Sequence, residues 1–140
     1  MDGAELMRTI VAGFEKSDLK PLLEALHEDV VWKSASKAGG PFSFQGEYRN
    51  RAGVTEVLSN ISKDYTFHHM KARDIVATQD LVWGLFDVGL RYDPKGKSAN
   101  AKALQLDMVI LWRLKDGKII EHQAFFDTAW LLAQQNAAQP

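Results

Sequence analysis

The strongest constraint on the fold is a tight turn, Lys115-Asp116-Gly117-Lys118, that separates two alternating apolar stretches. Asp-Gly in this setting is typical of a β-hairpin, because both residues accept the positive φ angles that short hairpin turns need. The segment from Gln105 to Gln135 is therefore predicted as a strand, a turn, a second strand and a closing helix. The second strand has one ionisable residue, His122, among its apolar inward positions, which makes His122 a candidate site.

Length and composition exclude several classes of protein. At 140 residues and 46% hydrophobic, the chain is expected to form one domain, residues 1–140, with a sizeable core. A net charge of −1 without a basic cluster argues against nucleic acid and anionic membranes as partners. The absence of cysteine excludes disulfides, and no apolar run approaches the roughly 20 residues of a membrane helix. With no signal-peptide pattern, the expected location is the cytoplasm.

The order of the predicted elements indicates an α+β fold. Apolar residues at helical spacing predict a first helix over 4–16, and Asn50 can cap a third helix after a short second one. A strand over 30–34 and a long loop over 36–49 lie between the second and third helices, and the length of the loop suggests a lid. Four long strands follow, so that helices precede an antiparallel sheet. The turns between these strands are predicted at 78–80, 93–96 and 116–117.

A period of two separates the faces of the long strands, and the uncharged even positions are expected to line a cavity between sheet and helices. These positions are Val82, Gly84, Phe86, Val88, Leu90, Leu104, Leu106, Met108, Ile110, Trp112, Ile120, His122, Ala124 and Phe126. The side chains predicted to contact a ligand are Trp32, Ser34, Phe67, Phe86, Val88, Met108, Ile110, Ala124 and Phe126. The expected ligand is a small apolar or aromatic molecule.

The opposite face of the sheet mixes charged residues with Trp83, Leu85, Val109 and Leu111. Such a face is too apolar for the solvent side of a monomer, and an exposed apolar patch of this kind usually marks a partner surface. We therefore expect a homodimer that packs sheet to sheet.

His122 is the first catalytic candidate. A histidine has an unperturbed pKa of about 6.5, and an apolar pocket lowers it, so a neutral imidazole could abstract a proton next to a carbonyl. The alternative is a core histidine that is hydrogen-bonded to a neighbour such as Ser34 or Tyr65. Tyr65 likewise either donates a hydrogen bond to a bound carbonyl or fills the core.

His69 follows His68, and neighbouring strand residues point to opposite faces. His69 therefore either faces the cavity, where it would pair with His122, or lies on the surface or dimer face. Two inward histidines without an inward carboxylate make a poor ligand set, so no metal and no other cofactor is predicted. Asp127, next to Thr128 before the last helix, is assigned to helix capping rather than catalysis.

The succession of elements resembles the cone-shaped domain of the nuclear-transport-factor-2-like superfamily, and more narrowly the SnoaL-like polyketide cyclase and ketosteroid isomerase-like group. The local marks are His27-Glu28-Asp29-Val30, Phe44-Gln45-Gly46, Tyr48-Arg49-Asn50-Arg51, Lys115-Asp116-Gly117-Lys118-Ile119 and Phe125-Phe126-Asp127-Thr128. The resemblance covers nearly the whole chain. It implies a curved antiparallel sheet wrapped around N-terminal helices, with an internal apolar pocket.

The resemblance also places the catalytic positions of these families on residues that cannot perform the same chemistry. The oxyanion-hole tyrosine, the base and the protonated aspartate of ketosteroid isomerases fall at Ile10, Ser34 and Ile110. The arginine and two aspartates of limonene epoxide hydrolases fall at Phe86, Val88 and Ala124. The acidic base of SnoaL-like cyclases has no counterpart, because the long strands carry no carboxylate of inward parity.

Three functional hypotheses follow. The first is an isomerase, cyclase or dehydratase that acts on a small carbonyl compound, with His122 as acid or base and Tyr65 or His69 as an orienting group. The second is a non-catalytic binding module, which the missing carboxylates favour. The third is that the cavity is collapsed and the outer sheet face serves as a protein interaction surface. The three stand side by side because this fold hosts binding proteins as well as enzymes.

Overall fold

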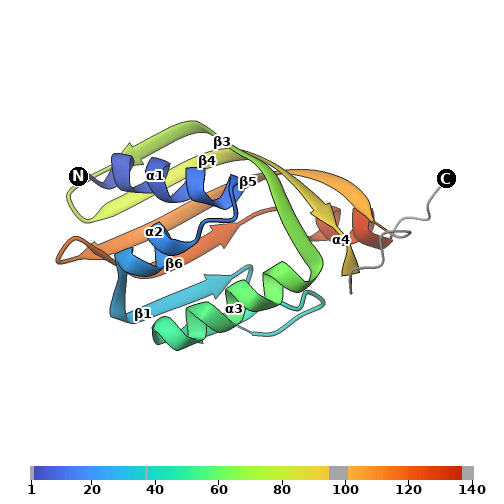
Figure 1. Ribbon diagram of the computed structural model, residues 1–140, viewed down its shortest axis with the longest axis horizontal. Helices are drawn as coiled ribbons and strands as arrows, with labels where there is room; N and C mark the ends of the chain where they lie inside the picture. The colour runs from blue at the N-terminus through green and yellow to red at the C-terminus, as the bar shows by residue number, and fades with distance from the viewer. Residues whose placement is uncertain (1, 37, 95–100, 137–140) are drawn as a thin grey trace.

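The computed structural model describes residues 2–36, 38–94 and 101–136, which form helices on one side of a curved sheet (Figure 1). In chain order the elements are α1 (Gly3–Glu15), α2 (Lys20–Ala25), β1 (Leu26–Ser34), β2 (Gly46–Arg49), α3 (Asn50–Asp64), β3 (Tyr65–Ala77), β4 (Leu81–Tyr92), β5 (Lys102–Lys115), β6 (Lys118–Phe125) and α4 (Thr128–Asn136). The predicted α+β cone is confirmed. The turn predicted at 93–96 lies partly outside the described residues.

One sheet contains all the described strands, in the order β2-β1-β6-β5-β4-β3. Neighbouring strands are antiparallel except β1 and β6, which run parallel. The sequence predicted an antiparallel sheet throughout. The parallel pair arises because the chain leaves β1 through β2 and α3, builds β3 to β5, and returns to the free edge of β1 only with β6.

The concave face of the sheet is covered by α1, α2 and α3, whereas α4 lies at the far end of β4 and β5 (Figure 1). The N-terminal cap of α1 is Asp2, whose side chain accepts a hydrogen bond from the backbone N–H of Glu5. Asn50 caps α3 as predicted, because its Oδ1 accepts from the backbone N–H of Gly53 at 3.1 Å. No helix among the described residues is long and apolar enough to cross a membrane.

The predicted hairpin between β5 and β6 is confirmed. Asp116 and Gly117 both have positive φ, at 53° and 75°, and Lys115 pairs with Lys118 across the turn. One residue farther from the turn the register shifts, so that Arg113 pairs with Glu121 and Ile120 has no partner. This bulge corrects one prediction: Ile119, with no exposed surface, is the inward residue, and Ile120 is not.

Beyond the bulge, two rows of inward side chains cross β5, β6 and β1. Trp112 pairs with His122, which pairs with Trp32, and in the next row Ile110 pairs with Ala124, which pairs with Ser34. The first row carries three rings, and the second has a single methyl group at its centre. The small side chain of Ala124 leaves open space beside the imidazole.

The loop predicted over 36–49 contains a short strand that the sequence analysis missed. Its last residues form β2, whose Arg49, Tyr48 and Glu47 pair with the end of β1.

The sheet packs closely against α1 at a glycine of β4. Gly84 on β4 faces α1, and a Cβ atom there would lie 2.9 Å from Sδ of Met7 and 2.7 Å from the ring of Phe86.

We expect Gly84→Ala to lower the free energy of unfolding by about 1–3 kcal/mol, because Met7 and Phe86 are fully buried and have little room to move. The matched control is Gly39→Ala, since a Cβ at Gly39 would meet nothing within 4 Å. This control should change stability by less than about 0.5 kcal/mol. Urea denaturation of the two variants measures the difference, and equal stability would contradict the close packing of α1 on β4.

Candidate functional site

The inner face of the sheet and the helices enclose a cavity of about 360 Å³. Apolar side chains form most of its wall, and the described lining includes no Asp, Glu, Lys or Arg. The lining residues are Phe14, Ser17, Leu19, Trp32, Ser34, Phe44, Leu58, Ile61, Ser62, Tyr65, Thr66, Phe67, Met70, Leu90, Leu106, Met108, Ile110, His122, Ala124, Phe126 and Leu131. The exposed lining residues are Ser17, Ser62 and Thr66, so the mouth lies between the α1–α2 turn, the end of α3 and the start of β3.

His122 lies on the sheet wall of this cavity and is 4% exposed. Its Nδ1 accepts a hydrogen bond of 2.9 Å from the indole N–H of Trp112. Its ring stacks on Trp32, with the centroids 3.5 Å apart and the planes 12° from parallel. Burial lowers the pKa of His122 from 6.5 to about 3. The imidazole is therefore neutral at pH 7 and is held between two indoles, rather than by Ser34 or Tyr65.

Ser34 is the second buried polar side chain of the wall, at 4% exposed. It comes from the end of β1, two residues beyond Trp32, so both side chains face inward. Its Oγ accepts a hydrogen bond of 3.0 Å from the indole N–H of Trp32. The polar tip of Trp32 is thus satisfied, while its ring still lines the cavity.

Tyr65, at the start of β3, also lines the cavity, as predicted. Its hydroxyl hydrogen-bonds Oε1 of Gln135 in α4. Burial raises the pKa of Tyr65 well above its ordinary value, with smaller contributions from Tyr92 and Asp64. The hydroxyl therefore stays protonated and joins α4 to the sheet.

His69 does not face the cavity. A register shift between Phe67 and His69 leaves His68 as an extra residue, so that Met70 points inward and His69 outward. His69 is exposed and borders a hollow on the outer face, together with Asp87 and Gln105. The predicted pairing of His69 with His122 is therefore wrong, and the alternative surface position is correct.

Most of the predicted ligand contacts do line the cavity. The predicted residues that line it are Trp32, Ser34, Phe67, Met108, Ile110, Ala124 and Phe126. Phe86 and Val88 point inward and are buried, but they are not among the lining residues. Helix α1 comes close to β4 at Gly84, two residues before Phe86, where a Cβ atom would lie 2.9 Å from Sδ of Met7.

The sequence analysis missed the part that the loop over 36–49 plays in the wall. Phe42 and Phe44 are buried and stack at 5.3 Å, and Phe44 lines the cavity and packs against Phe126 and Tyr65. Two phenylalanines in a loop otherwise rich in Gly and Ser were the available signal, because large rings in a polar loop usually bury themselves.

The polar side chain next to the last helix, Asp127, has a structural role. Asp127 caps α4, as predicted, with Oδ1 2.9 Å from the backbone nitrogen of Trp130. In the described part of the chain, no group of three or more acidic or histidine side chains could hold a metal ion. The chemistry of the cavity therefore rests on His122 and Ser34.

The burial of His122 predicts a pH dependence of stability. The unfolded chain binds a proton at about pH 6.5, whereas the folded chain binds it only near pH 3. Above pH 6.5 the free energy of unfolding is therefore not reduced by the titration of His122. It decreases as the pH falls from 6.5 toward 3, because only the unfolded chain binds the proton there. We expect the decrease to be on the order of a few kcal/mol. The variant His122→Asn, which cannot titrate, should lose less stability than the wild type between about pH 7 and pH 4.

The control for this measurement is His68→Asn, because His68 is exposed. Urea denaturation across the pH series should show the wild-type slope in this control. The ion pairs of the outer face, such as Arg73 with Asp87, are present in all three proteins, so they contribute equally to the three slopes. Equal slopes for wild type and His122→Asn would contradict the inferred burial of a neutral imidazole.

Comparison with solved structures shows the same architecture. A TerC structure co-crystallised with polyporic acid matches with a TM-score of 0.77 and 21% identity, over 95% of this chain and 97% of that one. An NTF2-like protein from Burkholderia thailandensis matches with a TM-score of 0.78 and 16% identity, over 100% and 99%. A protein from Xanthomonas campestris, provisionally assigned as a polyketide cyclase, has a TM-score of 0.75 and 22% identity over 94% and 95%. These likenesses establish the fold.

Sequence comparison gives the family. No curated protein matches the sequence at a significant level. The family model for the SnoaL-like domain matches residues 7–122, which is most of the chain. The protein thus belongs to the SnoaL-like domain family, with an NTF2-like fold.

Proposed function

We propose that the protein binds a small, uncharged, apolar or aromatic carbonyl compound in the cavity. The observation that carries this proposal is the composition of the wall: the described lining is apolar apart from hydroxyls and one neutral imidazole, and it holds no charged side chain. An ionised ligand would lose its hydration there without a counter-charge, which is costly. The volume of about 360 Å³ is near the lower end for small-molecule sites, so a molecule of two or three rings fits best.

Polar groups at both ends of the cavity support an oriented ligand. The buried end holds His122 and Ser34, and the exposed lining residues at the mouth, Ser17, Ser62 and Thr66, are polar. A ligand with an oxygen at its leading end can hydrogen-bond the buried pair while its rings contact the apolar wall. Binding of this kind needs no general base.

Turnover is a second candidate function, and the position of His122 in the wall favours it. Carbonyl isomerisation, cyclisation or dehydration would then begin with a hydrogen bond from His122 to the carbonyl oxygen. Tyr65 and His69 take no part, because the first is bonded to Gln135 and the second faces outward. Unchanged turnover in His122→Ala would contradict this second candidate.

The binding proposal predicts that Ala124→Phe abolishes affinity for an aromatic ketone. Ala124 lies between Ile110 and Ser34 in its row, and a ring at this position would occupy the space beside His122. We expect the dissociation constant of 2-acetylnaphthalene, measured by titration calorimetry, to rise at least tenfold, a change of about 1.4 kcal/mol. The control is Ala103→Phe, the same change at an exposed position of β5.

If Ala124→Phe and the wild type bound 2-acetylnaphthalene equally, the ligand would lie elsewhere. If the wild type did not bind 2-acetylnaphthalene, the proposed class of ligand would be wrong.

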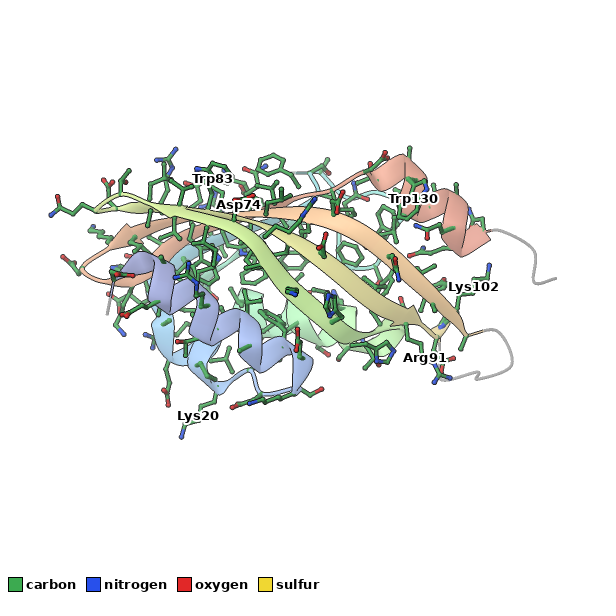
Figure 2. All side chains as sticks on the ribbon, turned by 90° about the horizontal axis from the view of Figure 1, so that it is seen from above. Lys20, Asp74, Trp83, Arg91, Lys102 and Trp130 are labelled. Atoms are coloured by element: carbon green, nitrogen blue, oxygen red, sulfur yellow. The ribbon has the colours of Figure 1, made fainter. Side chains whose placement is uncertain are left out.

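We also propose that the outer sheet face joins two copies of the chain. Trp83, Leu85, Val109 and Leu111 form a band across β4 and β5, with Trp83 paired to Leu111 and Leu85 to Val109. Figure 2 shows Trp83 on the face opposite α1 and α2, and Trp83 is 38% exposed. Charged residues flank the band but pair with one another, Arg73 with Asp87 and Asp107 at one end and Arg113 with Glu121 at the other. A neutralised, apolar surface suits a two-fold contact.

This second proposal predicts that Leu111→Lys produces a monomer, because two lysines would face each other near the centre of the contact. The control is Ala103→Lys, a lysine at an exposed position of the same strand outside the band. Light scattering during size-exclusion chromatography gives the mass of each variant. A monomeric wild type at tens of micromolar would show that the band has another use.

A further inference from the structure

The direction of the hydrogen bonds behind the cavity wall determines what the wall can offer a ligand. An indole N–H can only donate, so Nδ1 of His122, 2.9 Å from the indole nitrogen of Trp112, must present a lone pair. A neutral imidazole carries one proton. That proton is therefore on Nε2.

The Nε2–H group points into the cavity. No described residue accepts a hydrogen bond from Nε2, and Nε2 is not among the described buried polar atoms that lack a partner. The atom therefore keeps some accessible surface, although the residue as a whole is only 4% exposed. Since His122 lines the cavity, the accessible space is the cavity.

Ser34 shows the same arrangement. Its Oγ accepts from the indole N–H of Trp32 at 3.0 Å, and no described residue accepts the hydroxyl hydrogen of Ser34. That hydrogen is free to bond a ligand. Trp32 also stacks on His122, so a single indole directs the hydroxyl and holds the plane of the imidazole.

We propose that Trp112 and Trp32 are positioning residues that make the buried end of the cavity a hydrogen-bond donor site for a carbonyl oxygen, with His122 as a neutral donor and not a base. This inference rests on the proposed binding function and specifies its chemistry. A carbonyl oxygen accepts two hydrogen bonds, which matches the Nε2–H of His122 and the O–H of Ser34. An amine or other group that needs an acceptor finds fewer partners here.

The alternative role of His122 as a base is disfavoured by the same contacts. A lone pair on Nε2 would require the proton on Nδ1, where it would meet the indole N–H of Trp112 head-on. Protonating the ring would place a cation in a cavity whose described lining has no carboxylate. In catalysis, this geometry can stabilise charge on a carbonyl oxygen but cannot remove a proton from carbon.

The first test is the tautomer of His122 in the ligand-free protein. Long-range ¹H–¹⁵N correlation spectra of histidine-labelled protein at pH 7 should show Nε2 protonated and Nδ1 unprotonated. In Trp112→Phe, the tautomer that carries its proton on Nδ1 should also become populated. The control is Trp83→Phe, the same change on the outer face, where the tautomer should stay as in the wild type. Nδ1 protonated in the wild type would overturn the proposal.

The second test compares 2-acetylnaphthalene with 2-isopropenylnaphthalene, in which a methylene replaces the carbonyl oxygen. We expect the wild type to prefer the ketone about tenfold or more. His122→Gln, whose amide can reach the Nε2 position, should keep part of this preference. His122→Asn, which reaches only the Nδ1 position, should keep no more of it than the hydroxyl of Ser34 supplies, and should still bind the hydrocarbon. These two variants also serve if Trp112→Phe does not fold.

The outcomes separate this inference from the proposed function. Equal affinity of the wild type for ketone and hydrocarbon would overturn the donor site, while the binding function would stand. If the wild type bound neither compound, the binding function would be overturned and, with it, the assignment of a carbonyl ligand. A preference that His122→Asn retained would show that Trp112 and His122 do not set it.

Discussion

The pocket depends on one constraint: an imidazole is buried with no charge to balance it. Burial holds His122 neutral, with a pKa of about 3, and a neutral imidazole must have its two nitrogens satisfied in opposite senses. Trp112 satisfies the acceptor nitrogen, Trp32 supports the plane of the ring, and the donor nitrogen is left to the cavity. A carboxylate near this ring would raise its pKa and allow acid–base chemistry. The described cavity wall has none.

Much of this arrangement could be predicted from the sequence, because each long strand has one buried face. A period of two then sorts side chains correctly along β4 and β5, and the Asp116-Gly117 turn fixes where β6 begins. The inward position of His122 followed from the period of two along β6, which it shares with Ala124 and, just past the strand, Phe126. The same period predicted the absence of a cavity carboxylate, which the structure confirms for the described lining.

Two of the errors, the inward positions given to His69 and Ile120, share a physical cause, which is the β-bulge. An extra residue reverses the parity of a strand, and nothing in the side chains of His68 or Ile120 marks them as the extra ones. The bulge in β6 has the larger consequence. Counting evenly from the turn, with Lys115 opposite Lys118, would place Glu121 opposite Trp112. The unpaired Ile120 moves the register by one and brings His122 there instead. The hydrogen bond that orients the imidazole is thus a product of the bulge, and no pattern in the sequence announced it.

The outcome bears on how this fold changes its chemistry. The resemblance to ketosteroid isomerases implies that Ile10, Ser34 and Ile110 are replacements for catalytic side chains of those enzymes. Two of these replacements remain in the cavity wall, where Ile110 adds apolar surface and Ser34 keeps one hydrogen to donate. A wall with donors and no base can bind and polarise a carbonyl, but any proton that leaves carbon must go to the ligand itself or to water at the mouth. For the proposed ligand, the direction of two indole hydrogen bonds therefore decides which groups the cavity wall can offer.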